Sequence, residues 1–133
     1  MGQRKPYKKR KIALYLKTNE EIDFDYFLNK ISDFYCEQIK CLVGATKKEI
    51  LSSSRMMHIT TGRHALCYAM RTYHGNVITY QSIAKLLGKH HTSIVHSVQI
   101  VNPYLPYWRF VNKIKRMPDD DLLAILQTEN ETT

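Results

Sequence analysis

Residues 79–101 read TYQSIAKLLGKHHTSIVHSVQIV, and this stretch decides the fold. Thr79 is a residue type that caps helices, and Gly88 separates two segments whose apolar side chains recur at helical spacing. The segments cover 80–87 and, after two more residues, a run to about Val101. Because glycine permits the left-handed backbone of a tight turn, the stretch predicts two short helices joined as a helix-turn-helix.

The second of these helices has two chemically different faces. Its inward positions are apolar, and the small Ala84 on the first helix permits a close approach between the two. Its outward and N-terminal positions are donors, acceptors and one methyl group, namely Lys89, His90, His91, Thr92, Ser93, His96 and Gln99. Such a set can reach base edges and phosphates in a major groove. The alternative is a solvated polar face, but that would normally carry Glu and Lys, which favour helices more strongly.

Four other segments also carry apolar residues at helical spacing, and they predict helices over about 24–42, 47–53, 60–73 and 107–117. Thr46 with Glu49 three residues later forms a capping-box pattern for the second of them. The third is expected to start at Thr60 or Thr61. Its outer face should show three polar side chains, Arg63, His64 and Arg71.

No strongly periodic strand is visible, so the predicted fold class is all-α, a small helical bundle that contains the helix-turn-helix. The expected organisation has three parts: a basic flexible arm over 1–22, the DNA-binding domain over 23–117, and an acidic tail over 118–133 that frays.

Charge is distributed unevenly along the chain, whose formal net charge is +8. From Ile50 through Pro118 there is no Asp or Glu, although this span holds nine Lys and Arg and all six histidines. Burial cannot explain the gap, because nine cationic side chains must reach water. The pattern favours a polyanion partner. The acidic tail is a candidate surface for a protein partner.

Other classes of function have little support in these residues. His91 and His96 are five apart, which does not place them on one helical face, so no metal site is expected. No phosphate-binding glycine loop and no carboxylate pair occurs in the basic span, so neither an enzyme nor a cofactor is predicted. No apolar run of membrane-spanning length is present, and we expect a cytoplasmic protein, associated with the nucleoid if bacterial or phage-encoded.

The assembled residues resemble the C-terminal DNA-binding domain of the bacterial replication initiator DnaA. GKHHTSIVHS over 88–97 is similar to the family signature, which is usually close to GGRDHTTVLHA. Gly62-Arg63-His64, followed by an apolar helix, looks like the family's Pro-Arg-Gln start. Arg55 lies eight residues before Arg63, the spacing at which the family carries its minor-groove arginine. The resemblance covers roughly 24–117.

This resemblance implies sequence-specific binding to double-stranded DNA. It implies that Arg55 enters the minor groove, that Lys89 contacts phosphate, and that the start of the second helix faces the major groove with His91, Thr92 and Ser93. It also implies that the three polar residues of the 60–73 helix, Arg63, His64 and Arg71, contact backbone or groove edges.

Four departures separate this chain from the family pattern. His90 stands where the family usually has Asp, His64 replaces Gln, and one glycine of the Gly-Gly turn is missing. The linker around Gly75 and Asn76 also looks longer than is usual in the family. DNA binding is still expected, but the family's usual target sequence does not carry over. The family's nucleotide-binding module is not found in these residues, so we expect a standalone DNA-binding domain that acts in replication initiation or its regulation, with a phage or mobile element as a candidate source. The alternatives are a transcription regulator with an unrelated target and a basic protein that binds RNA or a membrane surface.

Overall fold

The computed structural model describes the backbone of residues 24–132 and the side chains of residues 25–125. The predicted basic arm, 1–22, lies outside the described residues. The described elements are α2 (Phe24–Val43), α3 (Lys47–Ile50), α4 (Met57–His74), α5 (Tyr80–Leu87), α6 (His91–Ile100), the 3-10 helix η1 (Pro106–Lys113) and α7 (Asp119–Thr132). No strand occurs between residues 24 and 132, and the predicted all-α class is confirmed.

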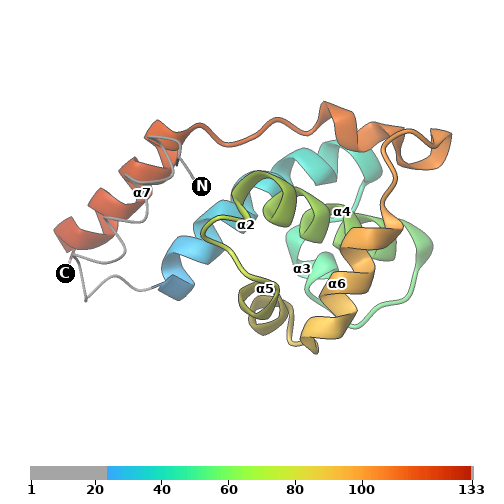
Figure 1. The fold of residues 1–133 in the computed structure, drawn as a ribbon, viewed down its shortest axis with the longest axis horizontal. Helices are drawn as coiled ribbons and strands as arrows, with labels where there is room; N and C mark the ends of the chain where they lie inside the picture. Colours follow the sequence, from blue (N-terminus) through green and yellow to red (C-terminus); the bar gives the residue numbers. More distant parts are fainter. Residues whose placement is uncertain (1–23, 133) are drawn as a thin grey trace, which may run out of the picture.

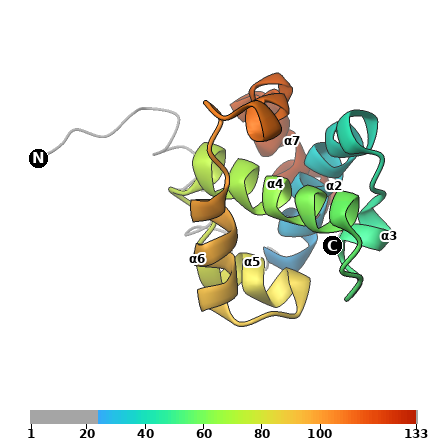
Figure 2. The ribbon, with the colours of Figure 1, turned by 90° about the vertical axis from the view of Figure 1, so that its right-hand side faces the viewer.

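The core forms where α4 packs across α2, with α5 and α6 together on one side (Figures 1 and 2). Helix α2 exists because its apolar residues repeat every three or four positions and present one continuous stripe. Four of its predicted inward residues are fully buried, namely Phe27, Ile31, Tyr35 and Ile39. Phe34 is only half-buried. The capping box at Thr46 is confirmed, although α3 is a single turn.

Helix α4 begins at Met57, so the prediction of a start at Thr60 or Thr61 is wrong. The N-cap residue, Met56, makes no side-chain capping bond. The first turn of α4 is held by packing rather than by a capping bond, because Ile59 is buried and Gly62 lies against residues of α2 and α3. A Cβ on Gly62 would lie 3.2 Å from the Ala45 Cβ and 3.3 Å from Cγ2 of Ile39, so a side chain at this position would fit only if these neighbours shifted.

The helix-turn-helix has the predicted bounds. The Thr79 side chain accepts a hydrogen bond from the Ser82 N–H and caps α5. Gly88 adopts φ 66° and ψ 38°, the left-handed conformation expected of the turn. The Lys89 N–H then donates to the Ala84 carbonyl at 2.9 Å and closes the end of α5. The predicted inward residues Ile83, Ala84, Leu87, Ile94 and Val101 are buried, and Val95 and Val98 are half-buried.

The C-terminal segment is more ordered than the sequence suggested. Residues 106–113 form a 3-10 helix rather than an α-helix, with Trp108 and Val111 buried. The acidic segment, which was expected to fray after Pro118, begins helix α7 instead, and its Leu122 is fully buried. The expected fraying is therefore wrong for the start of the tail, because an apolar side chain anchors it to the core.

A buried polar contact joins this C-terminal segment to α2 and α4. The Met117 N–H donates to the Tyr35 hydroxyl oxygen at 2.9 Å, and that hydroxyl lies 2.6 Å from Nε2 of His74. Burial lowers the pKa of His74 to about 4, so the imidazole is neutral near pH 7. The segment after η1 is thus tied down by hydrogen bonds as well as by apolar packing.

Candidate nucleic-acid interface

The start of α6 presents the polar face that the sequence predicted. Its seven predicted outward residues are all exposed, namely Lys89, His90, His91, Thr92, Ser93, His96 and Gln99. The turn at Gly88 aims the first residues of α6 away from the core, while Ile94 anchors the helix from its other face. Exposed donors and acceptors are therefore held on a rigid helix, as base readout requires.

His90 is the N-cap of α6. The Thr92 N–H donates to Nδ1 of His90 at 3.2 Å, so this ring nitrogen acts as an acceptor. The neutral ring that makes this contact carries its proton on Nε2. The His90 and His91 ring centroids are 4.6 Å apart. A histidine thus performs the capping role that the family's aspartate would perform, but it offers a donor where aspartate offers an acceptor.

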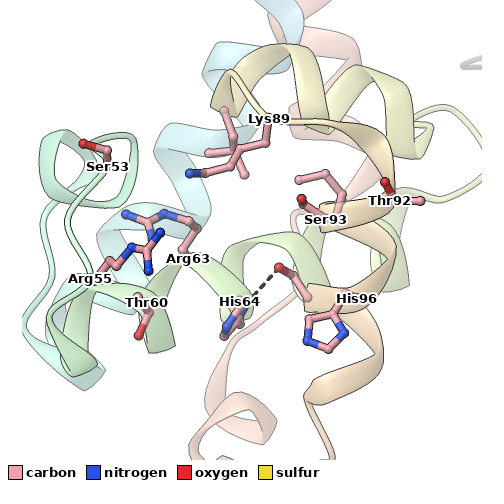
Figure 3. A pocket seen from close by; sticks show the side chains of 12 residues that line it. Ser53, Arg55, Thr60, Arg63, His64, Lys89, Thr92, Ser93 and His96 are labelled. Carbon is pink, nitrogen blue, oxygen red and sulfur yellow. Dashed lines mark hydrogen bonds between the residues drawn. The ribbon is translucent and has the colours of Figure 1, made fainter.

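A groove of about 780 Å³ runs between α6 and the linker that precedes α4 (Figure 3). It is lined by Ser53, Arg55, Thr60, Arg63, His64, Leu87, Lys89, Thr92, Ser93, Ile94, His96 and Ser97. Arg55 is exposed on the linker side, and Lys89 is exposed on the α6 side. In Figure 3 the Lys89 amine points across the groove toward the side on which both arginines lie.

Arg63 lies beside this groove but does not project outward as predicted. Its side chain is buried, and its guanidinium donates to three backbone carbonyls of the linker. Nε donates to the Ile50 oxygen at 2.8 Å, and Nη2 donates to the Ser52 and Ser54 oxygens at 2.7 and 3.1 Å. The outward orientation expected from helical spacing is wrong, because the linker folds back over this face of α4.

His64 and Arg71 are also engaged within the fold. Nδ1 of the half-buried His64 lies 2.9 Å from Oγ of Ser97, which ties α4 to α6 (Figure 3). Burial lowers the pKa of His64, and the nearby His96 and Arg63 lower it further. Arg71 donates to the carbonyls of Gly75 and Ile78 and lies 4.3 Å from the Tyr80 ring centroid. The expectation that both side chains point freely outward is therefore wrong.

Ser97 was missed by the sequence analysis. It is buried on α6, three residues after Ile94, where the helical spacing calls for an apolar side chain. That misplaced polar residue was the available signal, because a buried hydroxyl needs a partner. His64 supplies the partner, so the contact orients an imidazole at the floor of the groove.

The groove is electropositive. Within the described residues the structure contains three ion pairs, Lys47–Asp33, Lys85–Asp25 and Arg116–Asp119, and none of them involves a groove residue. Arg55, Arg63 and Lys89 therefore contribute positive charge to a lining that contains no carboxylate. A concave surface of this kind attracts an anionic partner such as a phosphate backbone.

Two further observations bear on the kind of site. Among the described residues no group of three or more His, Cys, Asp and Glu side chains comes together as a metal site would require. In the same part of the chain no helix is both long and apolar enough to cross a bilayer.

Comparison with known proteins identifies the domain. The family described as the bacterial dnaA protein helix-turn-helix matches residues 36–101, which contain both walls of the groove. The chromosomal replication initiator protein DnaA of Kosmotoga olearia is 31% identical over 70 residues. That match covers 53% of this chain and 15% of the relative, and no solved structure matches significantly. Residues 36–101 of this chain are therefore a DNA-binding helix-turn-helix domain of the bacterial DnaA family.

Proposed function

We propose that this chain binds double-stranded DNA sequence-specifically, with the start of α6 in the major groove and Arg55 in the adjacent minor groove. The observation that carries the proposal is the acid-free groove between two exposed elements, α6 and the Arg55 linker. A helix is narrow enough to enter a major groove, and an arginine on a neighbouring loop suits the narrower minor groove.

The exposed residues divide by the contacts they are expected to make. Lys89 neutralises a phosphate and fixes the register of the domain on the duplex. His91, Thr92 and Ser93 read base edges, since they are exposed at the N-terminal end of the helix. His96, one turn further along, extends this surface toward the neighbouring phosphates.

His90 is the residue expected to make the target sequence of this chain differ from that of its relatives. Because Nδ1 is occupied by the capping bond, Nε2–H is the group left for DNA. A donor at this position favours an acceptor, such as guanine O6 or N7 or a phosphate oxygen. An aspartate would instead accept from the cytosine amino group, so the target sequence should differ from that of relatives with aspartate.

The biological role that we propose is replication initiation or its regulation, at an origin in the bacterial cytoplasm. The origin would belong to the chromosome, to a phage or to a mobile element. This role is suggested by the DnaA relative, of which this chain spans only a small share. A transcription regulator would use the same surface on a different genomic site, so mapping the bound sites in cells separates the two roles.

Selection from random DNA duplexes tests the binding proposal directly. A single enriched motif is expected, with competition by duplex DNA far exceeding that by RNA or anionic vesicles. Affinity should fall steeply with salt, with a log-log slope near −5 if about six phosphates are neutralised. Recovery of unenriched sequences, together with equal competition by RNA, would contradict sequence-specific duplex binding.

A further inference from the structure

Arg63 is the buried cation of the groove, and its guanidinium donates hydrogen bonds to three backbone carbonyls. Only 8% of its surface is exposed, whereas Arg55, eight residues earlier, is exposed. The bonds from Arg63 reach the carbonyls of Ile50, Ser52 and Ser54, and the last of these immediately precedes Arg55. One buried side chain on a rigid helix therefore holds most of the linker that carries the exposed arginine.

We propose that Arg63 is a positioning residue, which holds the linker so that Arg55 can enter the minor groove, rather than a residue that contacts DNA itself. The inference rests on the proposed function, because it assigns Arg63 a role through a DNA contact of Arg55. It departs from what the family resemblance implied for Arg63.

The chemistry of the linker explains why it needs such a residue. After α3 the chain runs without helical hydrogen bonds from residue 53 until α4 begins, so several carbonyls there lack regular partners. Two serine side chains satisfy some of the backbone: Ser52 Oγ accepts from the Ser54 N–H, and Ser54 Oγ accepts from the Met56 N–H. These bonds satisfy N–H groups, whereas the carbonyls of Ser52 and Ser54, like that of Ile50 at the end of α3, accept from the Arg63 guanidinium.

Arginine suits this task better than lysine does. Its planar group presents donors in a fixed fork, so it can bond several carbonyls in one geometry. A lysine ammonium would keep the charge but would lose this fork. Holding the linker before DNA arrives also reduces the entropy that ordering it would cost on binding.

A double-mutant cycle tests the proposal, with Arg55→Ala, Arg63→Lys and the double variant measured on the selected duplex at one salt concentration. Arg55→Ala should weaken binding about tenfold, since it removes a minor-groove contact. Arg63→Lys should weaken it at least about threefold, and the double variant should lie within about twofold of Arg55→Ala. If the two losses multiply, Arg63 contacts DNA independently and the proposal is overturned; it is also overturned if Arg63→Lys costs nothing.

A second readout separates positioning from a general loss of structure. Replacing the A·T pairs beside the major-groove motif by G·C pairs adds an amino group in the minor groove. Replacing them by inosine·cytosine (I·C) pairs makes the same change in the major groove without adding the amino group. The wild type should reject G·C relative to I·C, and both Arg55→Ala and Arg63→Lys should lose that discrimination. An Arg63→Lys variant that discriminates like the wild type would overturn the proposal.

Arg71→Lys is the matched control, because Arg71 lies on the same helix and also holds carbonyls, but those of another turn. The fold-loss of DNA affinity caused by Arg71→Lys should multiply with the fold-loss caused by Arg55→Ala, to within about twofold.

Thermal unfolding shows whether each variant is folded at the assay temperature. If Arg63→Lys is not folded, Arg63→Gln replaces it in the cycle, because glutamine keeps two donors. If a motif is selected but Arg55→Ala costs nothing, this inference fails while the proposed function stands; if no motif is selected, the proposed function itself fails.

Discussion

The start of α6 and the middle of α4 border the same groove, and both carry cationic and histidine side chains. At the start of α6, Lys89 in the preceding turn and His91 on the helix are exposed. On α4, Arg63 and Arg71 bond backbone carbonyls and His64 pairs with Ser97. The two regions show that residue type alone does not distinguish a side chain free to bind a partner from one that holds the scaffold. Position decides it, because α6 begins at an exposed turn whereas α4 is the central helix.

This comparison predicts two separable effects of substitution. Changes at the exposed start of α6, apart from the cap residue His90, should weaken DNA binding and leave the free energy of unfolding unchanged. Changes on α4 should lower the free energy of unfolding, with DNA binding affected only through structure. The predictions below follow from this separation, from the largest effect to the smallest.

The largest effect is expected on the free energy of unfolding, when low pH protonates His74, the last residue of α4. Its pKa is lowered from 6.5 to about 4 by burial, so below pH 6.5 the unfolded chain takes up a proton that the folded protein resists. The resulting stability is fully present above pH 6.5 and is lost as the pH falls toward 4, by about 3 kcal/mol in total.

Urea unfolding between pH 7.5 and pH 4.5 measures this dependence. His74→Gln, which cannot titrate, should be less stable at pH 7.5 but should lose less stability across the range. Equal pH dependence in the two proteins would show that the buried histidine does not govern acid stability.

His91→Ala should produce the largest effect on DNA binding among single α6 substitutions. We expect a loss of about 1–3 kcal/mol on the selected duplex and little change on random DNA, because a base contact is removed. Gln99→Ala is the control, since Gln99 is also exposed on α6 but lies far from its N-terminal end. Titrations on both duplexes check this, and the assignment of the recognition helix is wrong if His91→Ala and Gln99→Ala behave alike.

Arg71→Gln should lower the free energy of unfolding by about 2 kcal/mol, because two charge-assisted hydrogen bonds and the stacking on Tyr80 are lost. Lys113→Gln, an exposed position away from the groove, should change it by less than about 0.5 kcal/mol. Unfolding in urea measures both. If Arg71→Gln instead keeps its stability and loses affinity, Arg71 is a DNA contact, and α4 resembles α6 more than the structure indicates.

The smallest effect on stability is expected at His90. His90→Ala removes the cap of α6 and should cost about 1 kcal/mol, whereas His90→Asp keeps a cap acceptor and should cost little. The aspartate variant should also shift the selected motif toward the family's usual target, since an acceptor replaces a donor. An unchanged motif in this variant would mean that His90 caps the helix without reading DNA.

Local chemistry was enough to predict several features from the sequence. Thr79 and Gly88 define the helix-turn-helix because their caps and backbone conformation depend on neighbouring residues only. The exposed residues at the start of α6 follow from the same local geometry. The absence of acids from 51–118 is a property of the sequence, and it predicted an anion-binding surface before any groove was visible.

Other features were decided only by contacts between distant segments. Helical spacing shows which face of α4 carries Arg63, but it cannot show that the carbonyls of 50–54 fold back over that face. The pairing of His64 with Ser97 joins residues on different helices, and α7 begins as an anchored helix because Leu122 reaches the core. A buried guanidinium or hydroxyl must find a partner wherever the chain brings one, so tertiary structure alone determined which polar residues remained free for DNA.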